Sequence, residues 1–459
     1  MRRINRLLLG TAIVIVAAAS AEAADFPVKA KPVEYVKVCG AYGAGFYYIP
    51  GTDICLRVGG YVWSDTQYRH RGAAALITPG NLATVAGFSH VLNRDVNDLS
   101  WRTRAMVVLD ARSQTPAGTL RSYISAGWQY TTNALGGPGA GANIAPYLER
   151  AFSQLGGFTF GYIASFFDAW SAFSVTTPNT LANRLTPAFA YTAKLGDGFS
   201  GTISIEDGQT HRNAITMSPY APLAAVMALN LYGGQALPDL VGNFRVDQAW
   251  GSFQLSGALH QLRVNQALAL AGIGDTWGWA AAASAAIKLP ALASKDELRL
   301  QAVSTQGALE YTGLSASGDS SAVSLGLRTG GLLGIGPVAD LFDSFVTIGG
   351  HNLVSAWSAT AQFQHWWTST FRSTFFVGYL KLDMPAAATA FGHPDFRLWQ
   401  VGANAILTAA PGLDFTTEVV WTNVATDCAN LVIVVCAVDP TRGKERDIVG
   451  AVFRGRRNF

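Results

Sequence analysis

The segment LSWRTRAMVVLDAR, Leu99–Arg112, alternates between two kinds of side chain. One set of alternate positions holds Trp101, Thr103, Ala105, Val107 and Leu109, and the other holds Arg102, Arg104, Met106, Val108 and Asp110. Successive side chains of a β-strand point to opposite faces of its sheet. This period of two therefore predicts a strand with one apolar face and one face that carries charge.

The same alternation recurs along the chain in segments of about 8–12 residues that are separated by turn signals. Two of these segments read as hairpins, with turns at QAWG (248–251) and APG (410–412). The clearest examples are Thr119–Thr131, Phe199–Asp207, Leu240–Val264 and Arg397–Val424. The pattern predicts an all-β protein, and after residue 23 no apolar run reaches the length of about 20 residues that a membrane-spanning helix needs.

Three features favour a transmembrane β-barrel over a soluble sandwich, which would also alternate. The polar faces carry small or polar residues, as a water-filled interior requires. Aromatic residues recur near segment ends, for example Trp128, Trp277 and Trp421. Short connectors such as LGDG (195–198) alternate with long ones such as 209–238 and 313–352, as in barrels with short turns at one end and long loops at the other.

The first 23 residues have the layout of a secretory signal peptide. MRRINR is basic, LLLGTAIVIVAAA (7–19) is apolar, and AEA (21–23) fits the small-residue cleavage rule. We expect cleavage near Ala23, with a retained membrane anchor as the alternative. The expected organisation is a signal peptide over 1–23, a periplasmic lead-in over 24–55 and a transmembrane barrel over 56–459.

The charge content is low and nearly balanced. Charged residues make up 14% of the 459 residues, and the formal net charge is +3. Cleavage near Ala23 removes three arginines and one glutamate and leaves a net charge of +1. A nucleic-acid partner is not expected, because such proteins carry a strong basic patch.

Four cysteines form two local pairs, Cys39 with Cys55 and Cys428 with Cys436. Exported proteins can keep disulfides, so we expect both local pairs to be oxidised, with free buried cysteines as the alternative. Neither pair has the close spacing of zinc ligands. No metal or cofactor is expected.

The sequence stops on DIVGAVFRGRRNF, which reads as another strand and ends at Phe459. After a signal peptide and many amphipathic strands, a terminal Phe is similar to the signal by which outer-membrane barrels are recognised for insertion. We therefore assign this role to Phe459 as a prediction.

Three stretches resemble one known family. VEYVKVCGAYGAGFYYIPGTDICLRVGGYVW (33–63) resembles the N-terminal signature of the alphaproteobacterial porins, the rhizobial and Brucella-type outer-membrane porins. QLGGFTFGYIASFFD (154–168) and LQAVSTQGALEYTG (300–313) are similar to further segments of that family. The resemblance implies an outer-membrane, homotrimeric, 16-stranded antiparallel barrel that contacts lipid and lipopolysaccharide. It also implies passive diffusion of small hydrophilic solutes and ions.

The resemblance also implies a constriction, because related porins fold their third loop inward so that its acidic residues face basic residues on the wall. We place this loop at Phe166–Arg184, where Asp168 is its one acid. The candidate basic residues of the wall are Arg57, Arg102, Arg104 and Arg121. The alternative for each arginine is a structural salt bridge or an exposed position at a strand end.

The sequence departs from the family near the expected pore. Trp63 stands where the family often has an arginine, and Tyr162 or Ile163 stands where it tends to have a charge. Both departures remove charge, so the sequence suggests weak ion selectivity and an aromatic contribution from Trp63 to the pore lining.

Other functions fit less well. A substrate-specific channel of the same architecture, for example for a sugar, is the main alternative. A barrel enzyme is not expected, because neither H-E-x-x-H nor G-x-S-x-G occurs and the seven histidines are scattered. A structural or adhesive barrel is a third option. The apolar stretches 221–232 and 431–436 are expected to pack within folded loops, with contact to another subunit, lipopolysaccharide or a surface partner as the alternative.

Overall fold

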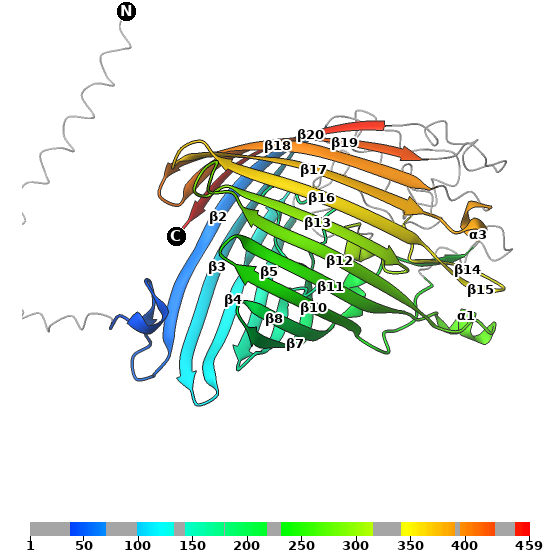
Figure 1. Cartoon of the computed structure of the whole chain (residues 1–459), viewed down its shortest axis with the longest axis horizontal. Helices are drawn as coiled ribbons and strands as arrows, with labels where there is room; N and C mark the ends of the chain where they lie inside the picture. The colour runs from blue at the N-terminus through cyan, green and yellow to red at the C-terminus, as the bar shows by residue number, and fades with distance from the viewer. Residues whose placement is uncertain are drawn as a thin grey trace, which may run out of the picture. The chain divides into compact units, whose positions relative to one another are not determined.

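The computed structural model describes residues 37–69, 99–132, 143–178, 180–217, 231–314, 341–390, 395–426 and 446–459. Within the compact unit Cys39–Phe459, almost all of the regular structure is antiparallel sheet (Figure 1). Within the described residues, no helix combines the length and the apolar character needed to cross a membrane.

Sixteen strands form the wall of the barrel. They are β2 (Cys55–Arg69), β3 (Leu99–Thr115), β4 (Gly118–Thr131), β5 (Asn143–Leu155), β6 (Phe158–Ala164), β7 (Leu185–Gly196), β8 (Phe199–Glu206), β10 (Asp239–Gln248), β11 (Gly251–Leu262), β12 (Thr276–Lys288), β13 (Glu297–Gln306), β16 (Ser355–Trp366), β17 (Phe371–Asp383), β18 (Phe396–Ala410), β19 (Leu413–Thr426) and β20 (Arg446–Asn458).

The remaining elements are short and lie in the connections. They are the 3₁₀ turns η1 (Gly40–Tyr42), η3 (Gly208–His211) and η4 (Leu309–Thr312), the helices α1 (Gln266–Leu270) and α3 (Ala386–Thr389), and the strands β1 (Tyr47–Tyr48), β9 (Ile215–Met217), β14 (Ser344–Thr347) and β15 (Gly350–Leu353).

The sheet closes on itself. Each wall strand pairs antiparallel with the next along the chain, and β20 then pairs with β2 from Tyr61↔Asn458 to Arg69↔Gly450. β1 adds two residues of pairing at the start of β2. The predicted 16-stranded antiparallel barrel is therefore confirmed.

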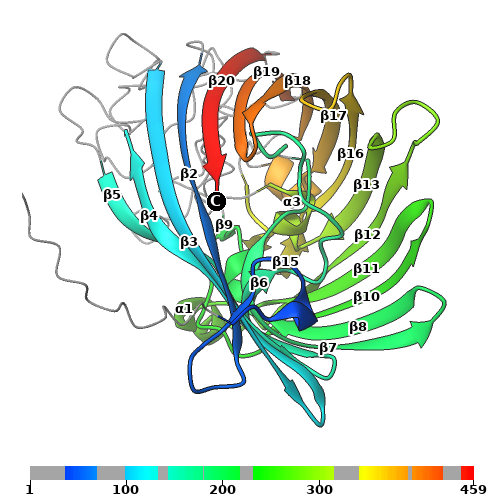
Figure 2. The same cartoon turned by 90° about the vertical axis from the view of Figure 1, so that its left-hand side faces the viewer.

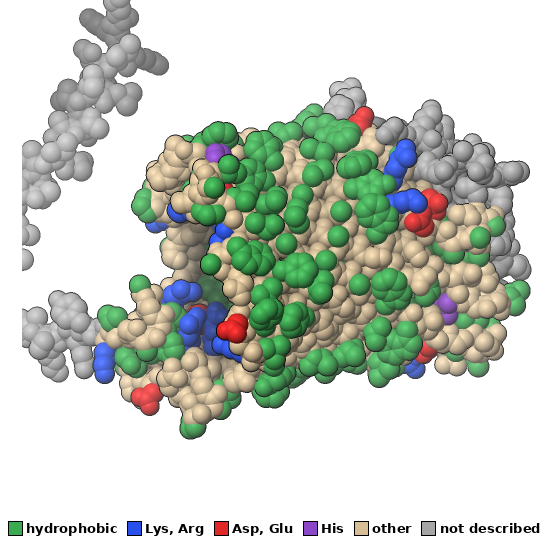
Figure 3. Space-filling view, viewed as in Figure 1, with side chains coloured by type: hydrophobic (Ala, Val, Ile, Leu, Met, Phe, Trp, Pro, Cys, Tyr) green, Lys and Arg blue, Asp and Glu red, His purple; other side chains and the backbone are tan. Residues whose placement is uncertain are grey.

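The two faces of the wall have the polarity expected for a barrel in lipid. On β3 the side chains of Trp101 and Val107 are exposed, whereas Arg102, Arg104 and Asp110 are buried. Other wall strands also expose large apolar side chains, and such side chains are spread over the face of the barrel seen in Figure 3. Such a wall is apolar toward lipid and polar toward the interior.

The two ends of the barrel differ in their connectors. Seven short turns, including 248–251 between β10 and β11, lie at the end that also holds Cys55 and Phe459, at the left in Figure 1. The connectors at the opposite end are longer, and the one between β13 and β16 contains η4, β14 and β15. Short turns face the periplasm in barrels of this type.

The backbone closes the sheet beyond the last paired residues of β20. Phe459 accepts a hydrogen bond from Gly60 N–H at 3.0 Å and donates one to Gly60 O at 3.1 Å. A Cβ atom at Gly60 would lie 2.2 Å from Met106 O and 2.8 Å from the Phe459 ring. Glycine is therefore required for this close approach. The role of Phe459 as an insertion signal stays a prediction.

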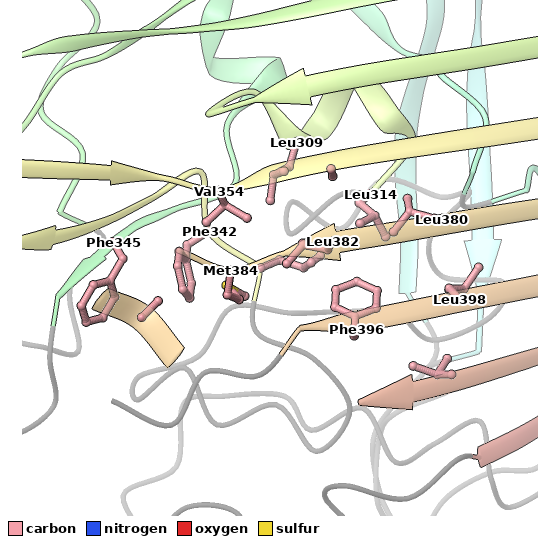
Figure 4. Close-up of a cluster of buried hydrophobic side chains, with 14 residues drawn as sticks. Leu309, Leu314, Phe342, Phe345, Val354, Leu380, Leu382, Met384, Phe396 and Leu398 are labelled. Atoms are coloured by element: carbon pink, nitrogen blue, oxygen red, sulfur yellow. The ribbon is translucent and has the colours of Figure 1, made fainter. Parts of the chain in front are cut away.

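Near the long-connector end, loop segments pack against the inner wall. Phe342 and Phe345 lie with Leu380, Leu382 and Leu398 in one buried apolar cluster (Figure 4). β14 pairs with β9 and β15 in a separate three-stranded sheet. These contacts hold parts of the long connectors inside this end of the barrel.

We expect Gly60→Ala to lower the free energy of unfolding by about 1–3 kcal/mol, because its methyl group overlaps a backbone oxygen and a ring. Urea unfolding of the refolded barrel, followed by its gel mobility, measures this change. Gly242→Ala is the matched control, since its Cβ atom would meet its nearest neighbour at an ordinary 3.7 Å. Equal unfolding midpoints for the two variants would contradict the requirement for glycine at position 60.

Candidate functional site: the interior of the barrel

The connector between β6 and β7, residues 165–184, lies across the polar faces of other wall strands. It contains the segment 166–184 that the sequence marks as the third loop. Near its start, Phe166 N–H donates to Glu206 Oε1 of β8 at 2.9 Å. Phe167 O accepts from Ser256 Oγ of β11 at 2.8 Å.

Further along, the same connector contacts β16, β18 and β19. Phe173 N–H donates to Gln362 Oε1 at 2.8 Å. The N–H groups of Val175 and Thr176 donate to the two carboxylate oxygens of Glu418 at 2.6 and 2.7 Å. Backbone donors of the connector therefore join Asn404 Nδ2 of β18, which donates at 3.1 Å, in satisfying a buried carboxylate of the wall.

The returning half of the connector lies close to β17. Thr180 is fully buried, and its hydroxyl lies 2.6 Å from that of Thr360. A Cβ atom at Gly378 would lie 2.0 Å from Thr180 Oγ1. The glycine on the inner face of β17 therefore makes room for the connector at this point.

A buried polar network ties other loop segments to the wall beside this connector. Asp239 of β10 accepts from Tyr311 Oη at 2.8 Å and pairs with His260 Nδ1 at 2.8 Å. His211 of η3 stacks on Tyr311 of η4, with ring centroids 4.3 Å apart. The network joins η3 and η4 to the wall strands β10 and β11.

Two carboxylates anchor a group of arginines on the inner faces of β20, β2, β3 and β4. The first is Asp110, which is fully buried. Arg112 and Arg121 each donate two hydrogen bonds to it, at 2.8–3.0 Å. Arg57 lies farther away, 3.8 Å from Asp110 Oδ2, and its side chain is 46% exposed.

The second carboxylate is Asp65, which lies farther along β2 and is shared by two arginines. Arg102 Nη2 lies 3.1 Å from Asp65 Oδ2, and Arg454 Nη2 lies 2.5 Å from the same oxygen. Trp63 is 3% exposed. The guanidinium carbons of Arg102, Arg104 and Arg454 lie 4.8, 5.0 and 4.2 Å from the Trp63 ring, which is cation–π distance.

Asp168 is not brought together with these arginines by the described contacts. Its carboxylate accepts from the backbone N–H of Arg184 at 2.6 Å, within the same connector. Removal from water, reinforced by the neighbouring Glu206 carboxylate, raises the pKa of Asp168 to about 7 despite that hydrogen bond. At neutral pH this side chain is therefore only partly ionised.

The predicted disulfide Cys39–Cys55 is confirmed, with the two Cα atoms 5.9 Å apart. It closes a loop that contains η1 and β1, drawn in dark blue in Figure 2. Phe46 packs beside both cysteines, and its ring lies 5.3 Å from the guanidinium carbon of Arg57 and 4.9 Å from that of Arg112. The clamp therefore holds an aromatic side chain against the arginines at the short-turn end.

The structure places the four predicted arginines on one side of the interior, and sequence reasoning missed three neighbours: Arg112, Arg454 and Arg456. Arg112 has the same parity on β3 as Arg102 and Arg104, so the alternation could have identified it.

Cys428–Cys436 and the stretch 431–436 lie outside the described residues, as does 221–230. Leu231 and Tyr232 are described; Leu231 is buried among apolar side chains, and Tyr232 Oη donates to Asp343 at 2.9 Å.

The barrel is closed, apolar on the outside and charged on the inside. One protein-family model matches this sequence, and the fold agrees with it. That model, described as a porin subfamily, matches residues 25–445. The chain belongs to the porin subfamily. Among curated relatives, this porin is 32% identical to Porin Omp2b of Brucella melitensis and to Porin Omp2b of Brucella abortus over 258 residues. Each match covers 54% of this chain and 64% of the relative, so it spans less than two thirds of the relatives' length.

Two solved structures show the same fold as this porin. The outer membrane channel DcaP of Acinetobacter baumannii aligns with a TM-score of 0.59 at 16% identity, over 90% of this chain and 99% of that one. The anion-selective porin from Comamonas acidovorans aligns with a TM-score of 0.50 at 10% identity, over 88% and 100%. These two likenesses show the fold, and the family model confirms the predicted porin family.

We expect the double variant C39S/C55S to lower the unfolding free energy by about 3 kcal/mol, because the disulfide restricts the unfolded chain. Thermal unfolding of the isolated porin measures this loss, and single-channel conductance should change much less. C428S/C436S is the comparison, because it removes the other predicted disulfide, whose shorter loop should make the loss smaller. Unchanged thermal stability combined with altered conductance would refute a clamp that mainly stabilises the fold.

Proposed function

We propose that this porin-family chain forms a water-filled channel through which small hydrophilic solutes and ions diffuse passively across the outer membrane. The observation that carries the proposal is the polarity of the closed sheet, with Trp101 and Val107 outside and Arg102 and Arg104 inside. Such a wall is stable in lipid only if its polar interior is hydrated or filled by protein. Membership of the porin subfamily points to transport rather than catalysis.

The proposed assembly and location follow from the same reasoning. We place the mature protein in the outer membrane after cleavage near Ala23, as a homotrimer in contact with lipid and lipopolysaccharide. The apolar outer faces of the strands support contact with lipid. The trimer is an expectation for a porin, and crosslinking of the protein in native membranes tests it.

The proposed constriction is the connector 165–184 together with the inner-face arginines of β2, β3 and β4. The contacts with Glu206, Gln362 and Glu418 support a connector that lies against the inner wall. Selectivity in such a pore depends on its width and on the charges that line it. Of the residues marked by the sequence, we propose Trp63, Arg102, Arg104 and Arg121 as part of the pore wall, with Arg57 nearest the short-turn end, whereas Asp168 takes part in holding the connector.

Liposome swelling with sugars of increasing size tests the general function. We expect swelling rates to fall with solute size and to rise in proportion to solute concentration. Saturation with one sugar would instead support the substrate-specific channel. The absence of conductance in planar bilayers would contradict both channels and would favour a structural role.

The variant Gly378→Ala tests the constriction. We expect it to lower single-channel conductance, roughly up to twofold, because the added methyl group pushes Thr180 from the wall toward the lumen. Gly257→Ala is the matched control, since its Cβ atom would lie 3.9 Å from the nearest atom. Combining Gly378→Ala with Thr180→Ala should restore conductance. Wild-type conductance in Gly378→Ala alone would contradict a constriction at this connector.

A further inference from the structure

The inner faces of β20, β2, β3 and β4 carry an excess of positive charge. We call the following set the arginine wall: Arg57, Arg102, Arg104, Arg112, Arg121, Arg454 and Arg456. The same faces hold Asp65 and Asp110, so seven cations stand against two anions. Neighbouring β5 adds Glu149 and Arg150, one charge of each sign, and does not change this excess.

The remaining described arginines of the inner wall are balanced one to one. Arg245 pairs with Asp247 at 2.8 Å on β10, and Arg299 pairs with Glu297 at 2.7 Å on β13. Arg372 of β17 pairs with Asp414 of β19 at 2.7 Å. The excess therefore belongs to the arginine wall, on one side of the interior.

The carboxylates near the proposed constriction accept hydrogen bonds from backbone N–H groups of the connector. Glu206 accepts from Phe166 N–H, Glu418 accepts from Val175 and Thr176 N–H, and Asp168 accepts from Arg184 N–H. Glu206 and Glu418 are almost fully buried. These carboxylates offer little to a cation in the lumen, and partial protonation of Asp168 near neutral pH weakens the third one further.

The guanidinium groups of the arginine wall also have too few carboxylate partners. Arg102 and Arg454 share one carboxylate, and the Nε atom of each is buried without a partner among the described residues. Arg104 directs its Nε to the neutral amide oxygen of Gln129 at 2.8 Å. Asp110 already accepts four hydrogen bonds from Arg112 and Arg121, which leaves Arg57 at 3.8 Å with a half-exposed guanidinium group.

Arg57 and its neighbours lie at the short-turn end of the barrel, where Figure 3 shows Lys and Arg side chains gathered around a hollow. A cleft lined by one sign of charge and walled by protein focuses its potential and concentrates ions of the opposite sign. Guanidinium groups also match the geometry of carboxylates.

We propose that the arginine wall makes the channel prefer anions over cations, with small carboxylates and inorganic anions as the favoured solutes. This inference rests on the proposed channel function and adds its solute class. It departs from the weak selectivity that the sequence suggests, because the missing charge at Trp63 is replaced by arginines that pack around its ring. Arg57 is the contact at the short-turn mouth, since its side chain is the one with an exposed and largely uncompensated charge.

The reversal potential of the refolded porin in a tenfold KCl gradient tests this preference. We expect chloride to permeate more than about threefold faster than potassium at low salt, and the ratio to fall as salt screens the wall. Replacing chloride by acetate should keep the sign of the preference. A channel that conducts but favours potassium, or neither ion, would overturn the inference and leave the proposed function intact. The absence of conductance would instead count against the proposed function.

Substitution of Arg57 locates the effect. We expect R57Q to lower the chloride-to-potassium ratio and R57E to lower it further, because the half-exposed side chain lies toward the lumen. R457Q is the matched control: it removes the same charge from the exposed outer face of β20 and should leave the ratio unchanged. Equal ratios in R57Q and the wild type, with R102Q also unchanged, would refute selection by the arginine wall.

Discussion

The hydrogen-bonded pairing of β2 with β20 is the constraint on which the rest of the structure depends. Lipid offers no hydrogen-bond partner to a strand edge, so a sheet that spans a bilayer must close. Here closure joins Tyr61 to Asn458 and continues through Phe459, whose backbone exchanges two hydrogen bonds with Gly60. The register of this pair also places Asp65 of β2 beside Arg454 of β20, so the seam that closes the sheet also assembles part of the arginine wall.

Closure creates a second requirement, because the polar groups on the inner surface of the barrel need hydrogen-bond partners. Water can hydrogen-bond to some of these groups, and loop segments bond to others. Glu418 and Gln362 accept from backbone N–H groups of the connector 165–184, and Asp239 is enclosed by His260 and Tyr311. The protein therefore satisfies these groups with donors from the loops and from neighbouring wall strands, and leaves arginines in excess on β20, β2, β3 and β4. The proposed solute preference depends on this asymmetry.

The fold could be predicted from the sequence because its signal is local. The period of two in Leu99–Arg112 predicts which side chains of β3 point inward and which point outward. The turns at 248–251 and 410–412 predict two hairpins. The site is less predictable, because it depends on register and on loop paths. Nothing near Trp63 in the sequence indicates that Arg454 will lie 4.2 Å from its ring, since that contact requires closure. Asp168 looks like an acid for the pore, yet its carboxylate bonds to Arg184 in the same connector, and only the path of that connector decides this.

The seam between β2 and β20 also fixes the order in which the molecule can be completed. Asp65 and Arg454 are separated by 389 residues, so nearly the entire barrel lies between the partners that close it. A ribosome-bound fragment without β20 has two open sheet edges, and such edges pair readily with other chains. The nascent protein must therefore be kept unpaired until β20 has been made, and the last step of its assembly is a long-range one. Until the seam between β2 and β20 forms, the two open edges are therefore the places at which the unfinished barrel is most exposed to wrong pairing.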